Sequence, residues 1–75
     1  MEMACINPDG TITKPARATL NAMKDTATGE EIARTTGFPL YRVRSVLREL
    51  VDTGLAALQD GRYTLTDLGL QKLDA

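Results

Sequence analysis

The spacing of apolar residues changes at Gly54, and this change constrains the fold more than any other feature of the sequence. Before it, apolar residues recur at the spacing of one face of a helix. After it, two short segments, 55–59 and 62–66, flank the pair Asp60-Gly61. An Asp-Gly pair between strand-like segments is a strong signal for a two-residue hairpin turn. The sequence therefore predicts a helical core followed by one β-hairpin.

The strongest helical signal spans about Leu40 to Thr53. Its apolar residues fall at i, i+3, i+4, i+7 and i+8, so they share one helix face. The residues of this stripe are Val43, Val46, Leu47, Leu50 and Val51. Pro39, at the N-cap, has no side-chain oxygen to accept a hydrogen bond from the first turn. We expect a contact of Phe38 with Val43 to act as a hydrophobic staple and offset that loss.

A second helix has the clearest start signal in the chain. Thr28 and Glu31, three residues later, form a capping box, in which each side chain accepts a hydrogen bond from the other residue's backbone N–H. Glu30 and Arg34 are spaced to pair on the outer face. Gly37 is free to take a left-handed conformation and ends the helix. A helix this short is stable only when it packs against neighbours.

The first helix is expected to begin between Thr13 and Ala16, with Pro15 in the first turn, where a missing N–H costs nothing. Its inner face follows helical spacing. The residues of this face are Ala16, Leu20, Met23 and Ala27. A final short helix opens at Thr66-Asp67. The side chains that can pack it back onto the core are Leu68, Leu70 or Leu73.

The length of 75 residues suits one small domain. We expect residues 1–12 to form a loosely ordered lead and residues 13–75 to form the domain. No apolar run is long enough to cross a bilayer, and the N-terminal segment lacks the basic and apolar regions of a signal peptide. The single cysteine, Cys5, cannot form an internal disulfide, which favours a cytoplasmic protein.

The residue types present argue against catalysis. The chain has no histidine and one cysteine, which removes the usual zinc ligands and a histidine general base. It has no glycine-rich loop that could cradle a phosphate. A core this small has no room to spare for a small-molecule cavity. We therefore expect no enzyme activity, no metal or other cofactor, and no small-molecule ligand.

The predicted order is helix, helix, tight turn, helix, hairpin and short helix, which is the order of a winged helix. The residues that carry a closer resemblance are Thr28-x-x-Glu31-Ile32-Ala33, Gly37, Val43, Leu47, Leu50, Gly54-Leu55 and Tyr63-x-Leu65-Thr66-x-x-Gly69-x-x-x-Leu73. The first group resembles the helix-turn-helix of winged-helix transcription regulators. The last motif is similar to the segment that leaves the wing in MarR-type regulators. The resemblance spans Pro15 to Leu73 and does not choose among MarR-type, ArsR-type and other small groups.

The resemblance implies a mainly α fold with a small β-hairpin, a winged helix-turn-helix with a three-helix core, a two-stranded wing and a short C-terminal helix. It further implies that the third helix (about 40–53) reads the major groove of double-stranded DNA. The hairpin at 59–62 then touches the DNA backbone or minor groove. MarR-type regulators add long flanking helices that build a dimer, a device that this turn-rich lead and short tail do not supply.

The distribution of charge supports DNA contact more than the net charge of −1 does. Between residues 32 and 48 there are four arginines and no acidic residue, so this segment carries +4 and the remainder carries −5. The polar face of the third helix can donate hydrogen bonds to guanine and to phosphates. The candidate DNA-binding residues are Tyr41, Arg42, Arg44, Ser45 and Arg48 on this helix, Arg62 at the hairpin, Arg34 on the second helix, and Lys14 and Arg17 on the first.

Other interpretations of these residues stay open. The outer face of a surface helix must be polar, and Arg48 can simply pair with Asp52. Tyr41 either covers the edge of the core or reaches DNA. Tyr63 and Phe38 are expected in the core. A winged helix also serves as a protein-interaction module without DNA binding, so a larger protein partner or a weak homodimer remains an alternative to DNA.

Overall fold

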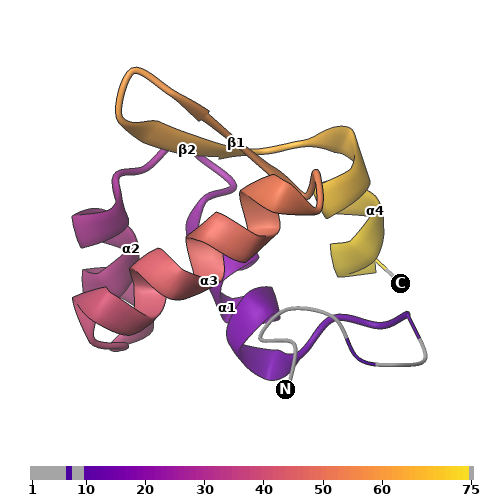
Figure 1. Cartoon of the computed structure of the whole chain (residues 1–75), viewed down its shortest axis with the longest axis horizontal. Coiled ribbons are helices and arrows are strands. Elements are labelled where there is room, and N and C mark those ends of the chain that lie inside the picture. The colour runs from indigo at the N-terminus through magenta and orange to yellow at the C-terminus, as the bar shows by residue number, and fades with distance from the viewer. Residues whose placement is uncertain (1–6, 8–9, 75) are drawn as a thin grey trace.

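The computed structural model describes residue 7 and residues 10–74. Within them, four helices surround a core that a two-stranded antiparallel sheet completes (Figure 1). The elements are α1 (Lys14–Ala22), α2 (Gly29–Thr36), α3 (Leu40–Asp52), β1 (Ala56–Gln59), β2 (Arg62–Leu65) and α4 (Asp67–Asp74). The predicted fold class, mainly α with a small β-hairpin, is therefore confirmed. Cys5 lies outside the described residues.

The core forms where α1, α2 and α3 pack against one another and against β1. Its buried side chains are Ile12, Ala16, Leu20, Met23, Ala27, Ile32, Val43, Val46, Leu47, Leu50, Leu55 and Ala56. Ile12, which sequence reasoning assigned to the lead, is thus a core residue. Among the described residues, Thr19 on α1 is the polar residue that is buried. Its hydroxyl donates to the carbonyl of Pro15 at 2.8 Å.

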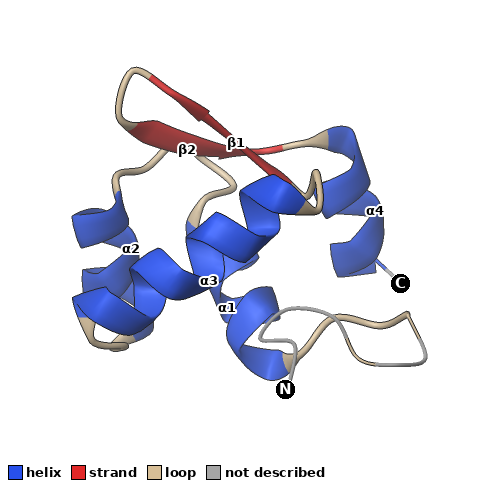
Figure 2. Ribbon diagram, viewed as in Figure 1, coloured by secondary structure: helices blue, strands red, loops and turns tan. Residues whose placement is uncertain are grey.

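The first helix begins as predicted but ends earlier than its apolar spacing suggested. Thr13 is the N-cap, and its hydroxyl accepts a hydrogen bond from the backbone N–H of Ala16. The helix stops at Ala22, so the assignment of Ala27 to its inner face is wrong. Ala27 is buried for a different reason, because it forms a β-bridge with Tyr63 of β2. Figure 2 shows the loop between α1 and α2 passing beside β2.

Both predicted signals at the ends of α2 are present. The N–H of Glu31 donates to the Thr28 hydroxyl at 3.1 Å, and the N–H of Thr28 donates to the Glu31 carboxylate at 2.8 Å. Gly37 closes the helix with φ of 79°, a left-handed conformation that glycine adopts without steric cost. The short helix is therefore defined at both ends by its own local sequence.

Helix α3 presents a narrower apolar face than the sequence indicated. Val43, Val46, Leu47 and Leu50 are buried, but Val51 is 36% exposed, so its assignment to the buried stripe is wrong. Val51 lies at the edge of this face, where the hairpin leaves it open. Pro39 is the N-cap without a side-chain hydrogen bond, as expected.

The hairpin turns at Asp60 and Gly61, with φ values of 54° and 78°. Two successive residues with positive φ define the type I′ turn that the Asp-Gly pair predicts. The register places Leu58 opposite Tyr63, so both side chains lie on the same face of the sheet.

The last helix is attached to the rest of the fold by specific contacts. The Thr66 hydroxyl accepts from the N–H of Gly69 at 3.1 Å and donates to the carbonyl of Gly54 at 2.6 Å. Of the three leucines available for packing, Leu73 packs against the core. The other two, Leu68 and Leu70, are exposed. None of the helices in the described residues is long and apolar enough to cross a membrane.

Candidate nucleic-acid interface

One face of α3 is open to solvent over most of its length. Because its buried residues occupy one side of the helix, the intervening positions point outward. The exposed residues of the first three turns are Tyr41, Arg42, Arg44, Ser45 and Arg48. Tyr41 is 78% exposed, so it does not cover the edge of the core. The structure thus brings five of the nine predicted DNA-binding residues together on one helix face.

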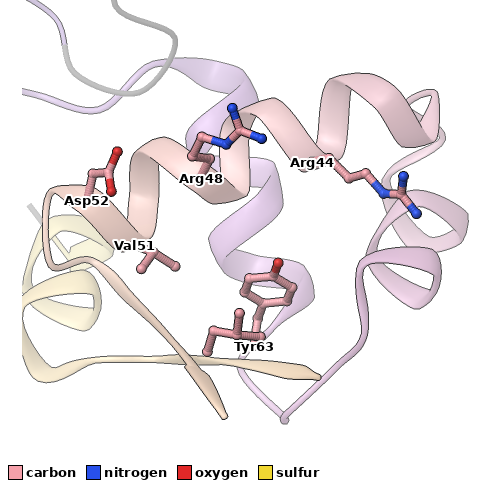
Figure 3. A pocket seen from close by; sticks show the side chains of 6 residues that line it. Arg44, Arg48, Val51, Asp52 and Tyr63 are labelled. Carbon is pink, nitrogen blue, oxygen red and sulfur yellow. The ribbon is translucent and has the colours of Figure 1, made fainter. Parts of the chain in front are cut away.

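The guanidinium groups of this face are available to an external acceptor. In the described part of the chain, Arg44 and Arg48 form no ion pair with a carboxylate. The alternative pairing of Arg48 with Asp52 is therefore not formed, and Figure 3 shows the Arg48 guanidinium pointing away from the Asp52 carboxylate. A guanidinium with unused N–H donors is suited to bidentate binding of phosphate or guanine.

Arg42 is held in a different way. Its guanidinium carbon lies 5.7 Å from the centre of the Phe38 ring, the arrangement of a cation–π contact. Phe38 in turn is half-buried and packs against the core, as sequence reasoning expected. The contact restrains the Arg42 side chain near the start of α3 while leaving the residue exposed.

Arg62 on β2 and Arg34 in the last turn of α2 both act on a carboxylate at the start of α2. Both positive charges act on the Glu31 carboxylate, whose pKa lies below its ordinary value of 4.5. The main cause of the lowered pKa is the hydrogen bond from the backbone N–H of Thr28, and the two arginines add to it. The exposed Arg62 of β2 and the exposed Arg34 of α2 therefore extend the basic surface from α3 toward the hairpin and α2.

Two grooves separate α3 from the hairpin. The larger, of about 340 Å³, is lined by Arg44, Arg48, Val51, Asp52, Leu58 and Tyr63 (Figure 3). The second, of about 280 Å³, is lined by Thr28, Gly29, Glu30, Leu40, Arg44, Leu47, Gly61 and Tyr63. Arg44 and Tyr63 line both, so they lie between the two grooves.

Sequence reasoning placed Tyr63 in the core and did not assign it to the site. The ring is half-buried and packs against the core, and it also lines both grooves. The signal that could have found it is its position two residues after the hairpin turn, directly opposite Leu58.

The two predicted residues of α1 have different surroundings from the arginines of α3. Lys14 is exposed at the first position of the helix. Arg17 is half-buried, and its Nη1 donates to the carbonyl of Leu73 at 2.9 Å. This hydrogen bond ties α1 to the last turn of α4 and gives Arg17 a structural role.

The arrangement as a whole offers hydrogen-bond donors and positive charge on an exposed helix beside a hairpin. Among the residues that the structure describes, no group of three or more His, Cys, Asp or Glu side chains is placed to hold a metal ion. No protein-family model matches the chain, and no curated protein matches it.

Proposed function

We propose that this chain is a small winged-helix DNA-binding protein that acts as a transcription regulator. The observation that carries the proposal is the exposed face of α3, where Arg44 and Arg48 have no carboxylate partner among the described residues and lie beside the hairpin. In this proposal α3 enters the major groove, and the hairpin contacts the backbone or the minor groove.

The topology supports a winged helix specifically. The bridge between Ala27 and Tyr63 adds a short extended segment, located between α1 and α2, to the edge of the hairpin. The order is then helix, short bridging segment, helix, helix, two-stranded hairpin and short helix, and the bridging segment is an addition to the order expected from the sequence. The single cysteine of the chain suits a cytoplasmic location.

The side chains have distinct roles in this proposal. Arg44 and Arg48 donate to guanine acceptors, because arginine matches the O6 and N7 atoms of guanine in the major groove. Ser45 and Tyr41 donate to phosphates. The remaining basic candidates, Arg34, Arg42, Arg62 and Lys14, contribute phosphate contacts and no sequence preference.

Titration of fluorescently labelled mixed-sequence duplex DNA at several salt concentrations tests the proposal. With four to five phosphate contacts, the slope of log K against log salt concentration is expected to be about −4. Arg44→Ala and Arg48→Ala should each weaken binding, whereas Lys24→Ala, which removes one exposed charge outside the interface, should not. Absence of binding at low salt, or a slope near zero, contradicts DNA binding.

A second candidate function is protein docking on the same scaffold. The observation that favours it is the exposure of apolar side chains, since Tyr41 on α3 and Leu68 and Leu70 on α4 are all uncovered. In that case the protein retains a partner in a pull-down from nuclease-treated extract and shows no binding to duplex DNA. Loss of the partner after nuclease treatment would instead assign the association to nucleic acid.

A further inference from the structure

The larger groove between α3 and the hairpin contains apolar side chains to which the proposed duplex binding gives no role. Tyr63 lies between β2 and α3 (Figure 3), and Leu58 lies beside it on the same face of the sheet. Leu58 is 53% exposed although it faces the helix side of the hairpin, and Val51 on α3 is 36% exposed. The groove therefore has an aromatic and aliphatic lining that no part of the described chain fills.

The rim of the groove is charged. Arg44 and Arg48 stand along α3, and Asp52 stands one turn further on. The volume of about 340 Å³ lies at the small end of the range for sites that hold small organic groups. An apolar lining with two arginines beside it is complementary to a planar ring that is joined to a negative charge. A nucleotide has this combination, and single-strand binding proteins pair stacking aromatics with basic grooves in the same way.

We propose that this groove holds one unpaired base of a DNA strand, with the phosphate next to that base on Arg48, which lines this groove and not the smaller one. The inference rests on the proposed function and changes one of its assignments: on a duplex with a single-stranded end, Arg48 contacts this phosphate instead of a guanine, and Arg44 keeps its guanine contact. The groove opens beside the polar face of α3, and in this proposal the single strand at the end of a bound duplex enters it. The preferred ligand is then a duplex with a single-stranded end.

Asp52 gives the groove a preference among bases. A carboxylate accepts hydrogen bonds and repels acceptors, so it favours a base with an exocyclic amino group. Cytosine has such a group at N4, whereas thymine has a carbonyl oxygen at O4. An unpaired cytosine is therefore expected to bind more tightly than an unpaired thymine, and Asp52→Ala should remove the difference.

The test compares a blunt duplex with the same duplex carrying a short single-stranded end, each labelled and titrated with the whole chain. The overhang should tighten binding by about tenfold, the effect of one stacked base. 2-Aminopurine at the first unpaired position should lose fluorescence when it enters the groove. Leu58→Ala should abolish both effects and leave binding of the blunt duplex unchanged, and Tyr63→Leu should also abolish both effects.

Leu70→Ala is the matched control, because Leu70 is 46% exposed and lies on α4, away from the groove lining. Equal affinity for blunt and overhanging DNA, or equal effects of Leu58→Ala and Leu70→Ala, would overturn the groove assignment while leaving duplex binding intact. Failure to bind either DNA would overturn the proposed function as well. A concentration-dependent dimer that Leu58→Ala abolishes would assign the groove to a second copy of the chain and overturn the inference.

Discussion

Ala27 and Tyr63 exchange two backbone hydrogen bonds. The N–H of Ala27 donates to the Tyr63 carbonyl at 3.0 Å, and the N–H of Tyr63 donates to the Ala27 carbonyl at 2.7 Å. These two hydrogen bonds connect the segment before α2 to β2. They therefore fix the hairpin against the helices at a point near the tip of the hairpin. The position of Arg62, and the width of both grooves beside Tyr63, depend on this connection.

Ala27→Pro should loosen the hairpin. Proline has no N–H, so one of the two hydrogen bonds is lost, at a cost of about 1 kcal/mol. The Tyr63 amide should then exchange with deuterium faster than in the parent chain. If its exchange is unchanged while the unfolding midpoint falls, the bridge does not hold the hairpin in place.

Gly69→Ala should be strongly destabilising. A Cβ at this position would overlap the backbone carbonyl of Leu55, which cannot rotate away as a flexible side chain can. Overpacking of this kind should lower the free energy of unfolding by about 3 kcal/mol, and urea unfolding measures this loss. The control is Gly29→Ala at the start of α2, where the added methyl meets Leu47 at an ordinary 3.7 Å. Equal stability of the two variants would show that α4 is not packed as described.

Arg17→Ala should reduce stability without affecting DNA binding. The variant loses the hydrogen bond to the Leu73 carbonyl, which joins α1 to the end of α4, at a cost of about 1 kcal/mol. Chemical denaturation measures this loss of stability, and a salt titration with duplex DNA measures the affinity for DNA. A drop in affinity as large as that of Arg44→Ala would return Arg17 to the interface.

Stability should fall in acid partly through Glu31. The pKa of this carboxyl is lowered in the folded state, first by the Thr28 backbone hydrogen bond, so its ionised form stabilises the fold above the ordinary value of 4.5. That stabilisation is lost as the pH falls below 4.5 and through the folded-state pKa. Glu31→Gln keeps an acceptor at the third helix position but does not titrate. Its melting temperature should therefore fall less than that of the parent chain on acidification, and an equal fall would contradict the prediction.

Local signals in the sequence were sufficient for the ends of the elements. The capping box of Thr28 and Glu31, the left-handed Gly37 and the Asp60-Gly61 turn all appear as expected, because each involves residues within a few positions of one another. Periodicity also identified most of the core. It failed at Ala27 and Val51, since apolar spacing does not show where a helix ends or what covers it.

The candidate site was predictable only in part. The arginines of α3 follow from the helical wheel, because burial of one face leaves the other exposed. The role of Arg17 does not, since its acceptor, Leu73, is 56 residues away in the sequence. Tyr63 was likewise assigned to the core alone, because its second role depends on how far the hairpin extends past the helices.

Short-range chemistry in the chain thus dictates four helices and a hairpin within the described residues, together with the basic face of α3. The docking of those elements decides which side chains remain free. Gly69 against Leu55 and Ala27 against Tyr63 are contacts between distant segments, and they position α4 and the hairpin. Contacts between distant segments depend on the packing of the whole molecule. The pattern of residues close together in the sequence therefore does not predict them.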